Sequence, residues 1–76
     1  MERFVSNGSA FYKADTIIKV SESGGTFTVV LNYDTGTNGV DTFTFANTNG
    51  TAAEVIERLI NEINFSKKAI IDATKV

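Results

Sequence analysis

A predicted amphipathic helix constrains the fold of this chain more than any other feature. Thr51 and Glu54 have the T-x-x-E spacing of a capping box, which marks a helix start. Apolar residues then follow at helical spacing along a single stripe: Val55, Ile56, Leu59, Ile60 and Ile63. We predict a helix over about residues 51–64. Its stripe must be buried, so the rest of the chain has to supply an apolar surface opposite it.

The residues before this helix have the composition of strands and hairpins. They are rich in Thr, Val, Ile and Phe and are interrupted by Asn-Gly and Gly-Gly pairs. Strand segments are expected at 3–6, 10–14, 16–23, 26–33 and 40–46. The alternation is clearest in 26–33, where Phe27, Val29 and Leu31 share a face. We therefore predict an α+β fold, an antiparallel meander of about four strands with the helix packed on one face.

Two local assignments follow from the same alternation. Within 16–23, strict alternation puts Ile18 and Val20 on one face, and Ile17 and Lys19 on the other. The tail, 65–76, fits an edge strand or a short second helix, and its period favours the strand narrowly. No Pro, repeat or low-complexity tract indicates a linker, so residues 1–76 are treated as a single domain.

Composition excludes several classes of site. The chain has 76 residues and contains neither Cys nor His. We expect no disulfide, no metal site, no cofactor and no catalytic residue. A domain this small often depends on disulfides, metals or self-association. With the first two absent, a homo-oligomer is the expected state.

Charge and hydropathy limit the expected partners. The net charge is −2 and the sequence pI is about 4.9, which gives no electrostatic reason to bind double-stranded nucleic acid or an anionic membrane. Residues 1–5 lack the apolar core of a signal peptide, and no apolar run reaches the length of a membrane span. We expect a cytoplasmic protein without membrane contact.

One tripeptide matches a catalytic motif. Asp34-Thr35-Gly36 has the D-T-G sequence of aspartic proteases, whose chemistry needs two carboxylates and would require a dimer across Asp34. The same residues suit a hairpin loop, because Asp and Gly favour turn conformations. The loop is the preferred interpretation, and a dimeric protease-like enzyme is a remote alternative.

A second alternative is binding of single-stranded nucleic acid. Such proteins stack bases on exposed aromatic rings beside basic side chains. The residues that fit this requirement are Lys13, Lys19, Tyr33, Lys67 and Lys68. Because acidic residues outnumber basic ones, core rings and a solvated face explain the same residues more simply.

Apolar residues that the helix leaves uncovered suggest an interface. Ile17, Val30 and one of Phe11 or Tyr12 are expected on the sheet face opposite the helix. Ile70, Ile71 and Val76 lie in the tail. Gathered into a patch, such residues mark an interaction site. The predicted interface residues are Ile17, Val30, Ile70, Ile71 and Val76.

The order of short motifs resembles a known family. The motifs are Arg3-Phe4, Asn7-Gly8, Ala14-Asp15-x-Ile17 and, in the helix, Glu54-Val55-Ile56-Glu57-Arg58. This layout resembles the small flagellar FlbD-type proteins, which run R-L-N-G-x-x-x-x-N-A-D-x-I and close with an E-V-I-E helix. It is also similar to uncharacterised short proteins of phages and bacteria. The resemblance implies a small non-enzymatic accessory protein with an unidentified protein partner.

Overall fold

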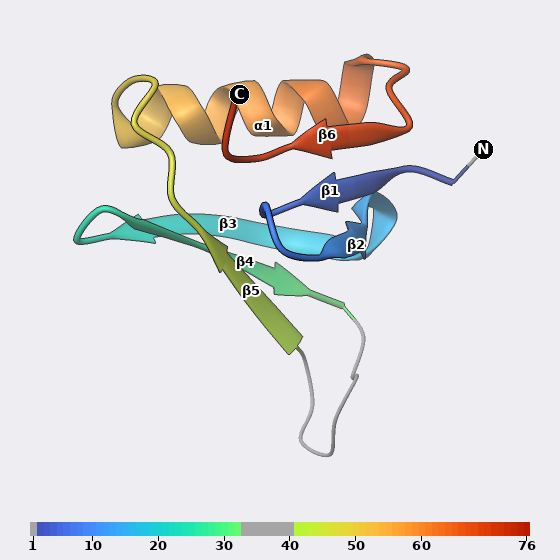
Figure 1. Ribbon diagram of the computed structural model, residues 1–76, viewed down its shortest axis with the longest axis horizontal. Helices are drawn as coiled ribbons and strands as arrows, with labels where there is room; N and C mark the ends of the chain where they lie inside the picture. Colours follow the sequence, from blue (N-terminus) through green and yellow to red (C-terminus); the bar gives the residue numbers. More distant parts are fainter. Residues whose placement is uncertain (1, 33–40) are drawn as a thin grey trace.

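The computed structural model describes residues 2–32 and 41–76, and in them the chain forms six strands and one α-helix (Figure 1). The elements are β1 (Phe4–Ser6), β2 (Phe11–Lys13), a 3-10 turn (Ala14–Thr16), β3 (Ile17–Ser23), β4 (Thr26–Leu31), β5 (Asp41–Phe45), α1 (Ala52–Phe65) and β6 (Ile70–Asp72). The predicted α+β class is confirmed. So is the preference for a strand in the tail, which forms β6.

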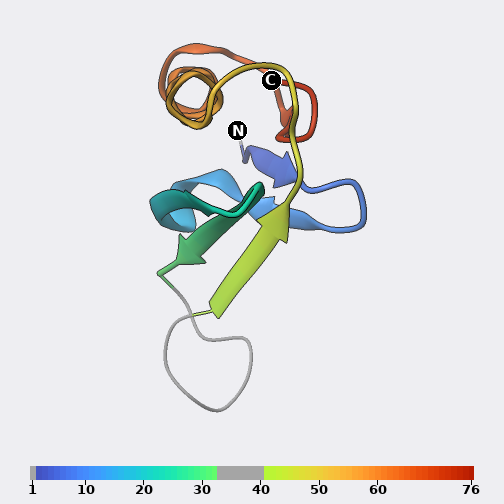
Figure 2. The same ribbon diagram turned by 90° about the vertical axis from the view of Figure 1, so that its left-hand side faces the viewer.

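The strands form two sheets of three, where the sequence predicted one sheet of about four. One sheet has the order β2-β1-β6, with β1 antiparallel to β2 and parallel to β6; the other is the antiparallel meander β3-β4-β5. The 3-10 turn redirects the chain after β2, so β3 begins a new sheet. Figures 1 and 2 show the two sheets curving around a shared interior, which α1 closes on the side between β6 and β3.

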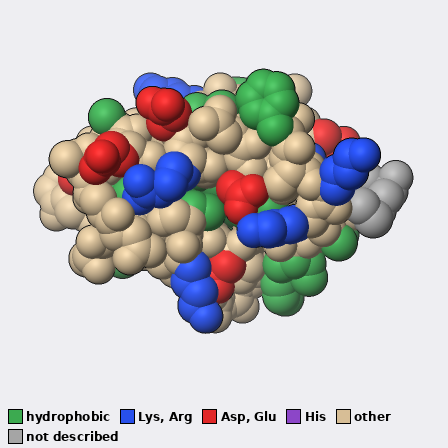
Figure 3. Space-filling model, turned by 90° about the horizontal axis from the view of Figure 1, so that it is seen from above, with side chains coloured by type: hydrophobic (Ala, Val, Ile, Leu, Met, Phe, Trp, Pro, Cys, Tyr) green, Lys and Arg blue, Asp and Glu red, His purple; other side chains and the backbone are tan. Residues whose placement is uncertain are grey.

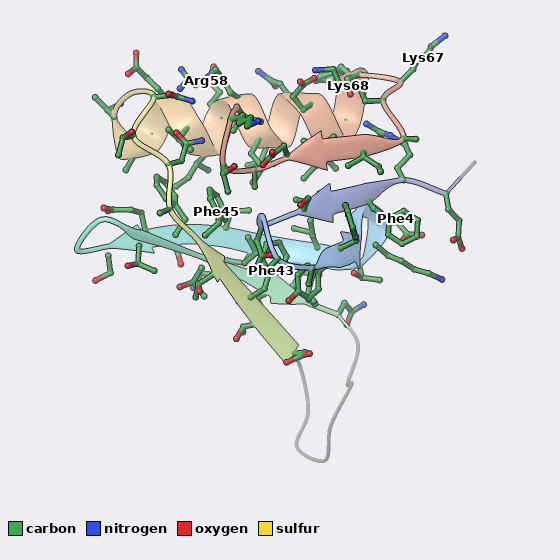
Figure 4. The ribbon with its side chains drawn as sticks, in the orientation of Figure 1. Phe4, Phe43, Phe45, Arg58, Lys67 and Lys68 are labelled. Carbon is green, nitrogen blue, oxygen red and sulfur yellow. The ribbon has the colours of Figure 1, made fainter. Side chains whose placement is uncertain are left out.

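One aromatic stack joins the two sheets in the core, and a second lies within the sheet β3-β4-β5. Tyr12 of β2 stacks on Phe43 of β5 with ring centroids 4.1 Å apart, and Phe27 stacks on Phe45 at 4.9 Å. Figure 4 shows Phe43 and Phe45 on the inner side of β5. The buried apolar residues form one cluster: Val5, Ala14, Phe27, Val29, Leu31, Phe43, Phe45, Val55, Leu59, Ile71 and Ala73. Since Ile71 of β6 and Ala73 just after it are among them, the tail belongs to the core.

A β-bulge changes which residues of β3 face the core. The β3–β4 hairpin turns at Gly24 and Gly25, whose φ angles of +59° and +89° suit a tight two-residue turn. The register is regular as far as Lys19 and then shifts between Lys19 and Ile17. Ile17 therefore faces inward opposite Leu31, and Ile18 is 58% exposed. The predicted alternation for 17–20 was wrong, because the extra residue reverses the faces on one side of the bulge.

The helix begins as predicted. Thr51 Oγ1 accepts from the Glu54 N–H at 3.2 Å, and Glu54 Oε1 accepts from the Thr51 N–H at 2.9 Å, which completes the capping box. Val55 and Leu59 are fully buried. Ile60, at the margin of the predicted stripe, remains 41% exposed.

A single arginine satisfies the other end of α1. The Arg3 guanidinium donates to the carbonyl oxygens of Ile63, of Glu62 at 2.7 Å and of Lys68 at 3.0 Å, and to Ser66 Oγ at 3.1 Å. The last carbonyls of a helix have no partner within the helix and carry partial negative charge. Arg3 therefore supplies the cap and ties the start of β1 to the end of α1.

We predict that Arg3→Ala destabilises the fold measurably. Removing the donors leaves several carbonyls at the helix end without their charged partner, so we expect a loss of about 2 kcal/mol in the free energy of unfolding, measured by urea denaturation. Lys13→Ala is the matched control. It removes only the exposed ion pair between Lys13 and Glu2, 3.2 Å long. Equal stability losses in the two variants would contradict the capping role.

Candidate functional site

Large apolar side chains are exposed in three places among the described residues: Phe11 (60%), Ile18 (58%), Ile60 (41%), Phe65 (78%) and Ile70 (53%). Ile18 and Ile60 face the junction of β3 with α1. Phe11 and Ile70 lie on the outer face of the first sheet, and Phe65 ends the helix. Single exposed residues are ordinary, whereas neighbouring ones mark interaction sites.

The first place is a groove between α1 and β3, which we call the α1–β3 groove. It encloses about 150 Å³ and is lined by Ile17, Ile18, Lys19, Val20, Ile60, Ile63 and Asn64. Five of these seven are Ile or Val. The bulge that exposes Ile18 therefore also shapes one wall of the groove, and the margin of the helix stripe forms the other.

The floor of this groove is an unpaired strand edge. β3 lies at the end of its sheet and pairs only with β4 among the described strands. Counting from the two-residue turn, the alternation of an antiparallel ladder directs the N–H and C=O groups of Val20 and Glu22 away from β4. Such an edge accepts another strand through main-chain hydrogen bonds.

The second place is the outer face of the sheet β2-β1-β6. The register sets Phe4 between Lys13 of β2 and Ile70 of β6, and sets Ser6 opposite Phe11. Cross-strand partners share a face, so Phe4, Phe11 and Ile70 all lie on the side opposite the buried Val5 and Ile71. We call this surface the aromatic face. Figure 4 shows Phe4 near the outside of the molecule at the start of β1.

The outer face of the sheet β3-β4-β5 is different in character. The register gathers hydroxyl side chains there, with Thr28 opposite Thr44 and Ser21, and Thr42 beside Val30. The sequence predicted apolar Ile17 and Val30 together on this face. Because of the bulge, Ile17 packs against the core, and Val30 is left half-buried between Lys19 and Thr42.

The remaining predicted interface residues are divided between core and surface. Ile71 is 1% exposed and Val76 packs against the core cluster, so neither offers a free apolar surface. Ile70 is exposed on the aromatic face. Sequence reasoning missed Ile18, Ile60 and Phe4. The first two had been assigned to buried faces, and the third acquires its neighbours only when β6 pairs with β1.

The lysines do not form one basic surface. Lys13 pairs with Glu2, and Lys68 Nζ lies 2.7 Å from Glu62 Oε1. Lys19 is on β3, and Lys67 extends away from the end of α1 (Figure 4). On the face formed by α1 and β6, both signs of charge are interspersed (Figure 3). Tyr33 lies outside the described residues.

A second hollow, lined mainly by polar residues, is larger than the α1–β3 groove. Its two basic side chains already have partners within the protein. It encloses about 290 Å³ and is lined by Glu2, Arg3, Lys13, Ala14, Asp15, Ile63 and Asn64. Arg3 caps the helix and Lys13 pairs with Glu2. No cluster of three acidic residues able to hold a metal occurs in residues 2–32 and 41–76. Asp34 of the D-T-G motif lies outside those ranges.

Hydrogen bonding lowers the pKa of three carboxyl groups. The backbone N–H and hydroxyl of Thr51 lower that of Glu54, the Lys68 ammonium that of Glu62, and the Thr74 hydroxyl and N–H that of Asp72. Each of these contacts fixes a local structure, the helix start, the helix end or the turn after β6. None places a proton donor or acceptor in a cavity.

Comparison with known proteins adds no relative. No family model, curated protein or solved structure matches the chain. Within the described part of the chain, no helix is long and apolar enough to cross a membrane.

Acid should destabilise the fold through these carboxylates. Their pKa values are lowered by folding, so the stabilisation is present above the unfolded pKa and is lost as pH falls through the folded pKa, below about pH 4. We expect the urea midpoint to fall over that range. Glu54→Gln keeps an acceptor for the Thr51 N–H but does not titrate, so it should flatten the pH dependence. Glu57→Gln, on an exposed residue of the same helix, is the control and should leave it unchanged.

Proposed function

We propose that the protein is a small non-enzymatic assembly protein that acts as a homo-oligomer, with a second copy bound at the α1–β3 groove. One observation carries this proposal: the unpaired edge of β3 lies beside exposed Ile18 and Ile60 in a single apolar groove. A strand edge supplies directed hydrogen bonds, and the flanking isoleucines supply area to bury.

A second copy fits this edge because antiparallel pairing of β3 with itself is symmetric. A two-fold axis perpendicular to the sheet leaves the core faces of both copies on the same side of the joined sheet. Residues that pair across the axis must therefore point to the same face. Val20 opposite Val20 of the second copy meets this condition and uses the outward N–H and C=O groups of both. The two grooves then meet around the paired valines.

The resemblance to FlbD-type proteins and to short phage and bacterial proteins supports the accessory character of the proposed role. On that basis we place it in the cytoplasm of a bacterial or phage-infected cell. Pull-down with the wild-type protein would identify the heterologous protein that such an assembly serves.

We predict that Ile18→Lys and Ile60→Lys each reduce the oligomer to monomer while the fold is retained. Both side chains are exposed, so a charge there costs little in the monomer but is buried unpaired in the complex. Mass by light scattering coupled to size exclusion, at two protein and two salt concentrations, measures this. Phe65→Lys is the control: Phe65 is 78% exposed but outside the groove. Its oligomer should be unchanged.

Three further variants identify the surface. Glu22→Pro removes an N–H that faces the second copy while keeping the main-chain bonds to β4, so it should also give monomer. It also removes the carboxylate that accepts from the Gly25 N–H at 2.8 Å, so Glu22→Ala, which loses that contact but keeps the N–H, is its control and should stay oligomeric. If Phe11→Lys or Ile70→Lys dissociates the oligomer and the groove variants do not, the aromatic face is the interface. A monomeric wild-type protein at all concentrations would refute the homo-oligomer.

A second candidate function rests on the aromatic face. Phe4 and Phe11 lie on neighbouring strands of one outer face with Lys13, an arrangement on which unpaired bases can stack. It would make the protein a single-strand nucleic-acid binder. The interspersed charges of the surface make this the weaker proposal.

The test is titration of a labelled single-stranded oligonucleotide, followed by fluorescence anisotropy at increasing salt. Binding through this face should weaken with salt. Phe11→Ala should cost about 1–3 kcal/mol of binding free energy, and Phe65→Ala should cost nothing. Absence of binding at low salt would exclude this function.

A further inference from the structure

Two Asn-Gly pairs lie in the described residues, Asn7-Gly8 and Asn49-Gly50. In such a pair the glycine nitrogen can attack the asparagine side-chain carbonyl, because glycine has no side chain to obstruct the approach. Whether it does so in a folded protein depends on two local features. The asparagine amide must be free to turn, and the glycine nitrogen must be available and able to lose its proton.

Hydrogen bonds restrain Asn7 and the following glycine, so this reaction is disfavoured there. Its Nδ2 donates to the Thr44 carbonyl at 3.1 Å, and its Oδ1 accepts from the N–H groups of Ser9 and Ala10, both at 2.9 Å. The N–H of the glycine that follows donates to Ser6 Oγ at 3.1 Å. The amide is thus fixed at both ends, and the attacking nitrogen is already engaged.

Asn49 lacks these restraints. Its exposed side chain makes one long hydrogen bond, from Nδ2 to the Val76 carbonyl at 3.3 Å. Among the described residues nothing donates to Asn49 Oδ1, and the Gly50 N–H has no acceptor. The amide can turn, and the attacking nitrogen is available.

The Asn49–Gly50 peptide bond is also next to a cation. Arg58 Nη2 donates to the Asn49 carbonyl oxygen at 2.9 Å, and a β-carbon on residue 50 would lie 3.1 Å from the same nitrogen. That β-carbon would also lie 2.9 Å from Glu54 Oε1, which accepts from the Thr51 N–H. Figure 4 shows Arg58 over the start of α1. A hydrogen-bonded cation and the positive end of the helix both stabilise a deprotonated peptide nitrogen. Arg58 is bonded to the oxygen of this same peptide and therefore favours the attacking form of Gly50. The Glu54 carboxylate opposes it, but its oxygen is bonded to the next N–H along the chain, that of Thr51.

We propose that Asn49 is a site of spontaneous deamidation promoted by Arg58, and that Asn7 is protected by the fold. The Gly50 nitrogen forms a bond to Asn49 Cγ, and the Cγ–Nδ2 bond breaks. The glycine amide proton leaves to solvent, and the leaving nitrogen takes up a proton and departs as ammonia. Water then opens the cyclic imide at either carbonyl, giving aspartate or isoaspartate. No oxidant or cofactor takes part.

The product would alter the start of α1. Either product replaces the amide that donates to Val76 with a carboxylate. Isoaspartate also adds a carbon to the main chain two residues before the capping residue Thr51. Loss of the bond to Val76, and the longer main chain of isoaspartate, therefore alter the connection between β5 and α1 irreversibly.

The experiment incubates the native protein at mildly alkaline pH and localises conversion by fragment-ion mass spectrometry of its peptides. We expect Asn49 to convert several-fold faster than Asn7. In denaturant the two rates should converge, since both sites are then plain Asn-Gly sequences. Arg58→Gln should slow Asn49 several-fold without affecting Asn7, and Arg58→Lys, which keeps the charge, should retain most of the rate.

Two outcomes would overturn the proposal. Asn7 could convert as fast as Asn49 in the folded protein, or Arg58→Gln could leave the Asn49 rate unchanged or raised. Circular dichroism of each variant confirms that the rates compare folded proteins. The comparison of the Asn49 and Asn7 rates does not depend on oligomeric state. Its failure can therefore be distinguished from a failure of the proposed assembly role.

Discussion

The contacts of Arg3 hold together parts of the chain that are far apart in sequence. Its guanidinium donates to the carbonyls of Glu62 and Ile63 at the C-terminal end of α1, where Ser66 also bonds the Glu62 carbonyl, and it binds the Lys68 carbonyl just before β6. Because Arg3 directly precedes β1, these bonds set where the helix ends relative to the first sheet. The parallel pairing of β6 with β1, which buries Ile71, follows from that placement.

The β-bulge in β3 has the corresponding role on the other side of the molecule. It turns Ile17 into the core and Ile18 outward, so a strand that would have offered a smooth alternation instead leaves an isoleucine beside its free edge. The helix completes the arrangement, because only Val55 and Leu59 of its stripe are fully buried and Ile60 is left at the margin. A small domain thus closes its core and still exposes a groove suited to an added strand.

Asn47 shows how the interior tolerates polar groups. It is buried, yet its side chain donates to the carbonyls of Ala73 and Val76 and accepts from the Asn49 N–H. No buried side-chain polar atom of the described residues lacks a partner. The polar groups in and around this core are occupied in holding segments together, and the unsatisfied features lie at the surface: an open strand edge and apolar side chains. Those features are the ones on which the proposed association rests.

The sequence by itself determined the local structure: the capping box at Thr51 and Glu54, the turn at Gly24-Gly25, the strand segments and the α+β class. These depend on residues close in the chain, whose spacing and backbone preferences can be read directly. Tertiary structure alone decided the split into two sheets, the burial of Ile71, the bulge beside Ile18 and the capping by Arg3. Each of these depends on contacts between distant segments, such as Arg3 with Glu62 or Phe4 with Ile70, and periodicity along the chain carries no information about which segments meet.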